Sequence, residues 1–399
     1  MTKLLDLKNN SVIAINQNNY TKEDNYKKVC YLDTDNITNN RINAFLKIDL
    51  TKEKLPSRAK RKCSLNSIIY SSVRPNQRHF GIIKEIPKNF LVSTAFIVID
   101  IIDLEKLDPN YLYYYITQDK ITHYLQRIAE CGTSSYPSIT PLDFLNIKIK
   151  LYLLETQQKI ARTLSILDQK IENNHKINEL LHKILELLYE QYFVRFDFLD
   201  ENNKPYQTSG GKMKFSKELN RLIPSGWSVR FLNHKIVSTY QPKTISKTLL
   251  NDSYSYSVYG GGGIIGRFTE YNHEQSEFII SCRGQCGISY LTLPKSWITG
   301  NAMVIRPTKS YTSKTYLYHT IKKYKLTNYI TGSVQPQITR QNLSTMPILI
   351  PKRKTLNKWN NISSLLWNLI HNNMQSTQTL TALRDFLLPL LLKQQVKPK

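Results

Sequence analysis

The sequence predicts an α+β protein in which two mixed α/β domains are separated by a pair of long, antiparallel, coiled-coil-like helices and related by an internal pseudo-two-fold repeat. Three observations predict this fold: a series of motifs that occurs twice, two long stretches with heptad-like apolar spacing, and β-rich segments in each half. The expected segments are 1–150 (first globular domain), 151–200 (first helix), 201–350 (second globular domain) and 351–399 (second helix and tail).

The repeat consists of short motifs in the same order in both halves. The first half contains Tyr111-Leu112-Tyr113, Gly132, Pro137, Ile139-Thr140 and Asn173-Asn174; the second contains Tyr316-Leu317-Tyr318, Gly332, Pro336, Ile338-Thr339 and Asn372-Asn373. From Pro137 and Pro336 onward the offset is constant at 199 residues (336 minus 137). A constant offset across different kinds of element indicates a duplicated unit that presents two similar surfaces.

Strand-like segments mark the globular domains. Residues 67–71 and 94–99 are rich in β-branched and aromatic residues, as strands are. The apolar run 90–104 is too short to cross a bilayer and contains Asp100, so it predicts buried strand and no membrane association. The second globular domain is expected to open at residues 223–227.

Two long helices are predicted, the first over roughly 155–192, ended by the polar, breaker-rich linker 200–214, and the second over about 355–392. Polar residues such as Asn178 and Asn373 interrupt both apolar seams at their middle, so we expect antiparallel helices whose interruptions meet. A helix of about 38 residues is about 57 Å long, so the pair should hold the domains apart. The predicted packing residues are Ile160, Leu164, Leu167, Ile171, Leu181, Leu366, Ile370, Leu380 and Leu387.

The chain is strongly basic, with 55 Lys and Arg against 30 Asp and Glu. Residues 1–150 carry a net charge of +7 (22 basic, 15 acidic) and residues 201–350 carry +13 (19 basic, 6 acidic), whereas 151–200 carry −2 (6 basic, 8 acidic). Charge concentrated on the globular domains predicts a polyanionic partner. Five scattered cysteines without a secretory leader predict a reducing, cytoplasmic location.

Several motifs resemble catalytic or cofactor sites without meeting their requirements. Residues 261–266 match G-x-G-x-x-G, but no helix is predicted next, so a glycine-rich turn beside Arg267 is favoured over a dinucleotide site. Asp108-Pro109-Asn110-Tyr111 resembles the tetrad with which amino-methyltransferases hold a flipped base, yet it lacks the second Pro and reads as a helix N-cap. Cys282 and Cys286 lack a second ligand pair for zinc. We therefore predict no catalytic residue and no metal site.

Polar and basic residues occupy corresponding turns of the two halves. Ser72-Val73-Arg74-Pro75 before Gly81 corresponds to Ser281-Cys282-Arg283-Gly284 before Gly287, and residues 132–137 correspond to 332–337. Arg pairs with guanine and Gln with adenine in direct base readout, and Ser contacts base edges or phosphates. The predicted DNA-binding residues are Arg74, Arg78, Ser135, Tyr136, Gly263, Arg267, Arg283, Gln335, Gln337 and Arg340.

These motifs together resemble the specificity subunits of type I restriction–modification enzymes over nearly the whole chain. The residues that carry the resemblance are 222–227, 258–266, 279–287 and 332–338 in the second domain, 155–171 in the first helix and 383–389 in the second. Residues 1–55 depart from the family pattern, because no Pro-x-Gly-Trp opening occurs there.

The resemblance implies a non-catalytic DNA-recognition subunit. Two target-recognition domains each read one half of a split, asymmetric sequence in double-stranded DNA, and the helices set the gap between the halves. Methyltransferase subunits bring S-adenosylmethionine, and restriction subunits bring ATP-driven translocation and Mg²⁺-dependent cleavage, so no cofactor is expected on this chain. Two alternatives remain: a DNA adenine methyltransferase with degenerate motifs, which would bind S-adenosylmethionine by itself, and a coiled-coil scaffold, whose DNA binding would be absent or insensitive to salt.

Overall fold

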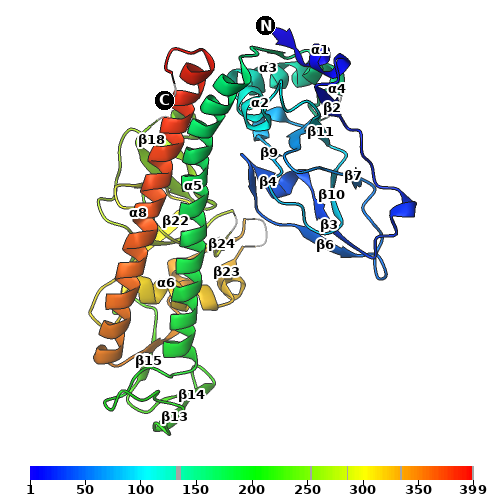
Figure 1. The fold of residues 1–399 in the computed structure, drawn as a ribbon. Helices are drawn as coiled ribbons and strands as arrows, with labels where there is room; N and C mark the ends of the chain where they lie inside the picture. The colour runs from blue at the N-terminus through cyan, green and yellow to red at the C-terminus, as the bar shows by residue number, and fades with distance from the viewer. Residues whose placement is uncertain (132–135, 252–253, 285, 333–334, 398–399) are drawn as a thin grey trace. The chain divides into compact units, whose positions relative to one another are not determined.

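The computed structural model describes residues 1–131, 136–251, 254–284, 286–332 and 335–397. The chain forms two compact units, residues 1–172 with 377–399 and residues 173–376. Each unit combines a globular α/β portion with parts of both long helices, α5 (Leu154–Tyr189) and α8 (Arg353–Leu392), so the boundary between the units falls inside both helices (Figure 1).

The first unit contains two four-stranded sheets, β2-β11-β8-β9 and β6-β3-β10-β7, and the two-stranded pairs β1-β12 and β4-β5. Its strands are β1 (Thr2–Lys3), β2 (Ile13–Ile15), β3 (Lys28–Leu32), β4 (Ile37–Thr38), β5 (Arg41–Ile42), β6 (Leu46–Asp49), β7 (Ala59–Arg61), β8 (Ile68–Ser71), β9 (Phe80–Ile82), β10 (Phe90–Ser93), β11 (Phe96–Ile101) and β12 (Lys148–Ile149). Its own helices are α1 (Leu4–Asn9), α2 (Pro109–Ile116), α3 (Asp119–Glu130) and α4 (Pro141–Leu145).

The buried side chains of the first unit explain its layers. The apolar run 90–104 forms two strands, β10 and β11, rather than one, because the chain turns at Thr94 and Ala95. One core lies between the two four-stranded sheets, and a larger one packs sheet β2-β11-β8-β9 against α2, α3 and the long helices. Asp108 caps α2 as predicted, its carboxylate accepting a hydrogen bond from the Tyr111 amide at 2.8 Å.

The second unit repeats this plan with sheets β16-β22-β19-β20 and β18-β17-β21 and the pairs β13-β14, β15-β25 and β23-β24. Its strands are β13 (Met213–Ser216), β14 (Arg221–Pro224), β15 (Ser228–Phe231), β16 (Val237–Tyr240), β17 (Tyr256–Gly260), β18 (Gly263–Phe268), β19 (Phe278–Ser281), β20 (Ser289–Leu291), β21 (Trp297–Ile298), β22 (Ala302–Pro307), β23 (Ile330–Thr331), β24 (Gln337–Ile338) and β25 (Pro347–Ile350). Its own helices are α6 (Lys314–Lys323) and α7 (Arg340–Leu343).

The predicted duplication is visible in strand order and direction. In both units an antiparallel four-stranded sheet has the same chain order, and the adjoining sheet contains one parallel pair, β3 with β10 and β17 with β21. The pair β1-β12 corresponds to β15-β25, so the first unit has this pair although it lacks the predicted opening motif. Within the described residues only the first unit has a strand in the place of β7.

The two long helices pack antiparallel within each unit (Figure 1). In the first unit Ile160 and Leu164 share a core with Leu391 and Leu392, while Asp168 pairs with Arg384. In the second unit Asn178 contacts Asn373 and His182 contacts Trp367. The Asn373 amide donates to the Asn178 side-chain oxygen at 2.9 Å, so the polar interruptions of the two seams meet as predicted.

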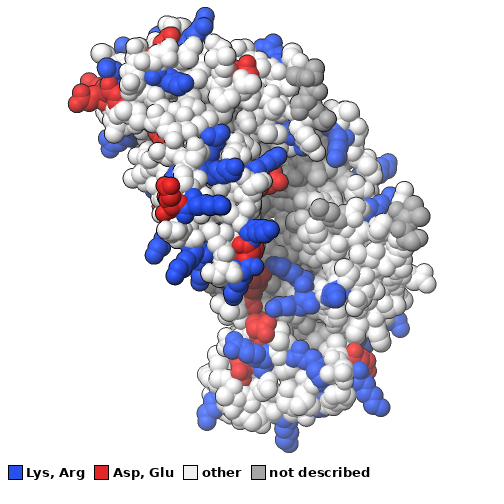
Figure 2. All heavy atoms as spheres, turned by 90° about the vertical axis from the view of Figure 1, so that its right-hand side faces the viewer, with Lys and Arg blue, Asp and Glu red and all other residues white. Residues whose placement is uncertain are grey.

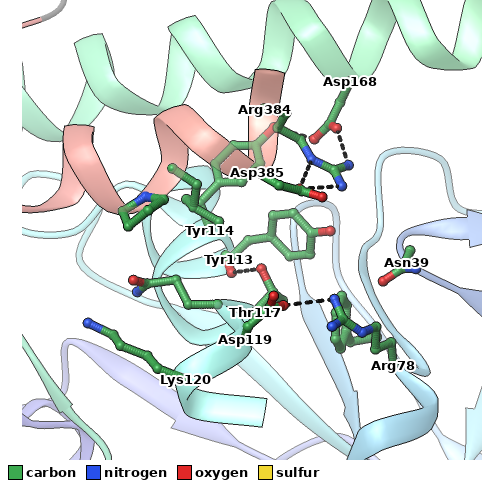
Figure 3. A pocket seen from close by; sticks show the side chains of 14 residues that line it. Asn39, Arg78, Tyr113, Tyr114, Thr117, Asp119, Lys120, Asp168, Arg384 and Asp385 are labelled. Atoms are coloured by element: carbon green, nitrogen blue, oxygen red, sulfur yellow. Dashed lines mark hydrogen bonds and ion pairs between the residues drawn. The ribbon is translucent and has the colours of Figure 1, made fainter. Parts of the chain in front are cut away.

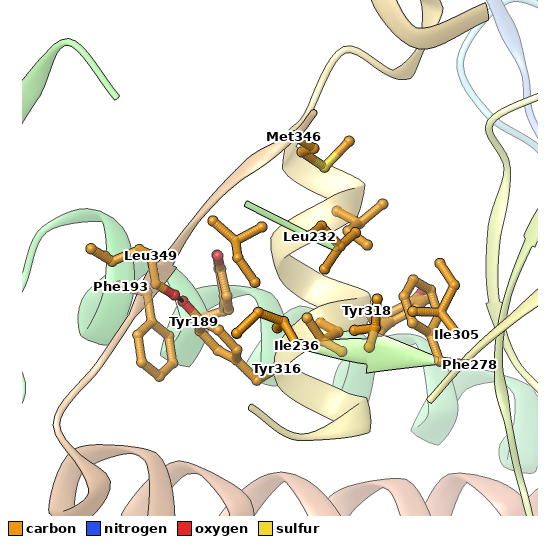
Figure 4. Packing of buried hydrophobic residues seen from close by; sticks show 14 of the residues in the cluster. Tyr189, Phe193, Leu232, Ile236, Phe278, Ile305, Tyr316, Tyr318, Met346 and Leu349 are labelled. Carbon is orange, nitrogen blue, oxygen red and sulfur yellow. Dashed lines mark hydrogen bonds between the residues drawn. The ribbon is translucent and has the colours of Figure 1, made fainter. Parts of the chain in front are cut away.

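The core of the second unit combines aliphatic and aromatic side chains around α6 (Figure 4). Tyr316 of α6 is fully buried between Tyr189 and Phe193 at the end of the first long helix, and its hydroxyl donates to the Leu349 carbonyl at 2.6 Å. Trp359 of α8 closes the same cluster. No helix of the described residues has the length and apolar character that crossing a membrane requires.

Candidate nucleic-acid interface

The first candidate loop, residues 72–79, connects β8 to β9 in the first unit and is called the first loop below. Its backbone is tied to the segment before α4: the Arg74 amide donates to the Pro137 carbonyl at 2.9 Å, and the Ile139 amide donates to the Ser72 carbonyl at 2.8 Å. At its start, the Ser72 amide and hydroxyl both donate to the Ala95 carbonyl, each at 2.8 Å. Loop and segment therefore form one surface.

The second candidate loop, residues 282–288, connects β19 to β20 and is tied down in the same way. The Ile338 amide donates to the Cys282 carbonyl at 3.1 Å, the Cys282 amide donates to the Asn301 carbonyl at 3.0 Å, and Arg283 forms an antiparallel bridge with Gln337. In the first unit the equivalent bridge joins Val73 to Ser138.

These bridges correct the predicted correspondence between the loops by one residue. Ser71 pairs with Phe96 and Ser281 pairs with Ala302, the first residues of equivalent strands, so Ser71 corresponds to Ser281. Arg74 therefore corresponds to Gly284, and Arg283 corresponds to Val73. The sequence alignment failed here because it matched Ser72, the second of two adjacent serines, with Ser281.

In the first loop, two predicted arginines are held in defined places. Arg74 has a left-handed backbone (φ 47°), and its guanidinium lies over the exposed ring of Tyr136, 5.3 Å from the ring centre. Arg78 is also left-handed (φ 57°) and pairs with Asp119 of α3 at 2.9 Å. The structure thus brings Arg74, Arg78 and Tyr136 to one loop surface. The predicted contact Ser135 lies outside the described residues.

In the second unit, Arg283, Gln335, Gln337 and Arg340 are all exposed and lie within the loop, its bridged segment and the start of α7. An arginine and a glutamine on paired backbone segments form a compact set of donors and acceptors. Both side chains match the base edges that direct readout uses. Burial raises the pKa of the neighbouring Cys282 thiol, so it stays neutral and takes no part as a charge.

The glycine-rich segment forms the turn of a hairpin, β17-β18. This agrees with the glycine-rich turn that the sequence favoured over a dinucleotide-binding site. A Cβ at Gly261 would lie 2.8 Å from the Arg283 carbonyl, so glycine there allows the hairpin to support the second loop. Gly263 is buried against the Tyr290 ring, and the Arg267 guanidinium donates to the carbonyls of Tyr254 and Ser255. Gly263, a predicted DNA contact, therefore has a packing role. Arg267, another predicted contact, uses its guanidinium to brace its own hairpin, and the structure does not bring it to the second loop.

A pocket of about 170 Å³ lies in the first unit between Arg78 and the long helices (Figure 3). On the helix side, Arg384 contacts Asp168 and Asp385, each at 2.8 Å, and the Tyr114 hydroxyl donates to Asp168 at 2.6 Å. Burial alone would lower the pKa of Arg384, but the two carboxylates raise it above its usual value, so this arginine stays charged. Paired charges therefore line the helix side of the pocket.

The predicted helix residues occupy the helix interface to different extents. Ile160 and Leu164 are fully buried in the first unit, Leu387 packs at the edge of the same core, and Ile370 is fully buried in the second unit. Leu181 and Leu366 pack against the second unit's core, and Leu167, Ile171 and Leu380 are half-buried.

Figure 2 shows that Lys and Arg outnumber Asp and Glu on the face it presents. Sequence reasoning missed two residues that shape the loops, Asp119 and Tyr290, and it placed Gly261 in a glycine-rich turn without its contact to the second loop. These contacts connect segments far apart in the chain, and no local signal marks the contacts themselves. The proximity of a glycine run to a basic loop could be found only from strand pairing.

Comparisons with known proteins agree with this architecture. Residues 6–183 and 224–383 match the family model for the type I restriction modification DNA specificity domain. The type I restriction enzyme HindI specificity subunit of Haemophilus influenzae is 23% identical, and the match covers 93% of this chain and 95% of that protein. The MjaIX specificity subunit of Methanocaldococcus jannaschii is 24% identical over 73% of this chain and 70% of its own.

A solved structure supports the fold. The crystal structure of the type I restriction–modification S subunit from M. genitalium aligns with a TM-score of 0.56 at 17% identity, covering 98% of this chain and 99% of that one. Because the family model matches most of the chain, in two copies that follow the internal repeat, this protein belongs to the DNA specificity subunits of type I restriction–modification systems.

Proposed function

We propose that the chain reads a bipartite, asymmetric double-stranded DNA site, with the first loop contacting one half and the second loop contacting the other. The observation that carries this proposal is that both loops are fastened by the same backbone bonds yet present different side chains. Equivalent scaffolds place the loops equivalently, whereas Arg74 with Tyr136 and Arg283 with Gln337 favour different bases. Because the two loops present different side chains on equivalent scaffolds, the two halves of the DNA site should differ in sequence.

The long helices set the spacing between the two half-sites in this proposal. Inserting four residues near Asn178 adds about 6 Å of rise and about 40° beyond a full turn, which keeps the apolar stripe nearly aligned. The variant should still assemble and read the same half-sites across a gap longer by close to two base pairs. Methylome sequencing would decide it, since an unchanged gap with full activity contradicts a spacing role for the helices.

Two exposed apolar patches offer docking places for methyltransferase subunits. Ile166, Leu383 and Phe386 are 45%, 43% and 65% exposed in the first unit. Their repeat equivalents at the 199-residue offset, Leu365, Ile184 and Leu187, are 61%, 44% and 65% exposed in the second. Patches related by the repeat fit two copies of one partner. S-adenosylmethionine would then reside on those subunits, and ATP and Mg²⁺ on restriction subunits.

Base reading is tested by Arg283→Ala and Gln337→Ala in the intact system, followed by methylome sequencing. Each variant should relax recognition in one half-site only, with a loss of about 1–3 kcal/mol per direct base contact. Lys295→Ala, an exposed cation paired with Glu274, is the matched control and should leave the site unchanged. Uniform weakening over all sequences would reassign the residue to phosphate contact. S-adenosylmethionine binding by the purified chain would favour the methyltransferase alternative.

A further inference from the structure

A basic segment, residues 58–61, lies next to the first loop through two backbone hydrogen bonds. The Arg58 carbonyl accepts a hydrogen bond from the Thr94 amide at 2.8 Å. The carbonyl of the following residue, Ala95, accepts a hydrogen bond from the Ser72 amide at 2.8 Å. Ser72 is the first residue of the loop. Arg58 therefore lies at the same end of the sheets as the first loop, although it follows a different strand, β6, in the chain.

Among the described residues, no carboxylate pairs with the cations of this segment. Arg58 and Lys60 are exposed and form no ion pair with any described residue. Arg61 is half-buried, its Nη2 contacts only the Thr94 carbonyl at 3.5 Å, and its Nε has no partner among the described residues. Burial lowers the pKa of Arg61, as expected for a cation without a compensating anion. Positive charge thus accumulates beside the turn at Thr94 and Ala95, where an anion would be stabilised.

The second unit places a cation beside the equivalent turn from an unrelated part of the chain. Strand pairing makes Gly300 and Asn301 the counterparts of Thr94 and Ala95. As at Ala95, the Asn301 carbonyl accepts a hydrogen bond from the amide of the first loop residue, Cys282. Residues 242–244 pack against Gly300, where a Cβ would lie 2.8 Å from the Pro242 carbonyl and 2.7 Å from the Thr244 hydroxyl. Lys243, in the middle of this segment, is exposed and follows β16 rather than the counterpart of β6.

We propose that Arg58 and Lys243 bind DNA backbone phosphates beside the bases contacted by the first and second loops. The proposal rests on the function proposed for the loops. Phosphate contacts of this kind fix the register and orientation of a reading loop on the duplex without selecting a sequence. Two cations that occupy equivalent places but come from different segments are not explained by the duplication itself, since the 199-residue offset does not relate them.

The experiment measures binding of the full chain to a fluorescent 30-base-pair duplex of random sequence between 50 and 200 mM NaCl. Arg58→Ala and Lys243→Ala should each lower the slope of log affinity against log salt by about 0.9, the value for one phosphate contact. The ratio of the affinity at 50 mM NaCl to the affinity at 200 mM NaCl should therefore be about 3.5-fold smaller for each variant than for the parent chain. Arg58→Lys keeps the charge and should keep the slope.

Lys52→Ala is the matched control, because Lys52 is an exposed cation in the turn after β6 and has no described contact with the loop or with Thr94. Its slope should equal that of the parent. An unchanged slope for Arg58→Ala, the same drop for Lys52→Ala, or no binding of the duplex at 50 mM NaCl would overturn the proposal. Equal melting temperatures would exclude misfolding as the cause of a loss.

Sequence selection from the same random pool separates this proposal from the function proposed for the loops. Arg58→Ala and Lys243→Ala should enrich the same sequences as the parent, whereas Gln337→Ala should enrich altered ones. If Gln337→Ala has no effect while Arg58→Ala lowers the slope, the loop assignment fails and the phosphate contact stands. If Gln337→Ala changes the enriched sequences while Arg58→Ala leaves the slope unchanged, the phosphate contact fails alone.

Discussion

The two units share strand order but differ where their globular portions meet the long helices. In the first unit the contact includes a polar site, where Asp168 pairs with Arg384 and accepts a hydrogen bond from the Tyr114 hydroxyl. At the same repeat positions the second unit has His319, Trp367 and Leu185, and Trp367 is surrounded by the rings of His182, Tyr318 and His371. Duplication therefore preserved the backbone plan while the side chains that fasten it diverged from charge to aromatic packing.

The largest effect is expected from removing the aromatic centre of the second unit. Trp367 is 6% exposed, so Trp367→Ala should lower the free energy of unfolding by about 3–5 kcal/mol. Urea denaturation followed by tyrosine and tryptophan fluorescence measures this loss. Leu365→Ala, two residues away and 61% exposed, is the control and should change stability by under about 0.5 kcal/mol. Similar losses for both variants would show that the buried Trp367 ring contributes no more to stability than an exposed leucine does.

Acid should weaken the second unit through its buried histidines. Burial, reinforced by Lys314 and His182, lowers the pKa of His371 to about 4, and burial with Lys322 and His182 lowers that of His319 to about 3. A lowered folded-state pKa means that stability is present above pH 6.5 and is lost as the pH falls toward 4. The loss should reach roughly 3 kcal/mol from His371 alone.

Hydrogen exchange at pH 7 and pH 4.5 locates this acid effect. Protection factors, which correct for the slower intrinsic exchange at pH 4.5, should fall in α6 and its helix contacts, and His371→Leu should reduce the change. An equal fall in the protection factors of α2 in the first unit would contradict the difference between the two junctions.

The polar junction of the first unit should show a strong coupling between its partners. Arg384→Ala leaves Asp168 and Asp385 without their cation, and we expect a loss of about 1–3 kcal/mol, since the pair is partly exposed. The double variant Asp168→Leu with Arg384→Leu should cost less than the sum of the single changes. A double-mutant cycle with additive losses would show that the ion pair contributes no specific coupling.

The smallest effect is expected between Asn178 and Asn373 in the helix seam of the second unit. Replacing both by Leu should raise stability, by about 1 kcal/mol or less, because apolar residues remove a partly buried polar pair from the seam. The expected cost is a less well-defined register between the two helices rather than a loss of stability. Thermal melting measures the stability, and cross-linking between cysteines placed at exposed positions of the two helices measures the register. A single register with unchanged stability would argue that this pair is neutral.

Local signals in the sequence were sufficient to predict the helices and the duplication. Apolar spacing placed the long helices within a few residues of α5 and α8, and Asp108 was recognised as a cap because capping depends on neighbouring residues. The meeting of Asn178 with Asn373 followed from the position of the polar interruptions in each seam. These features depend on periodicity or on residues close in sequence.

The candidate interface was less accessible to sequence reasoning because it depends on contacts between distant segments. Arg78 was predicted, but its partner Asp119 belongs to another helix, and Arg267 carries the expected charge while its donors are used inside its own hairpin. Two adjacent serines, Ser71 and Ser72, allowed a one-residue shift that aligned Arg74 with Arg283. Strand register resolves this shift, and composition does not.

The division of the compact units inside the helices has a consequence for biosynthesis. Leu391 and Leu392 pack in the same core as Ile160 and Leu164, so the core of the first unit is incomplete when its own strands leave the ribosome. Roughly 200 further residues must be translated first, which at about 5–20 residues per second takes on the order of 10–40 s. The second unit, continuous in sequence, can close earlier. The amino-terminal half of the nascent chain thus completes its core last, and during that interval Ile160 and Leu164 lack the cover that α8 provides.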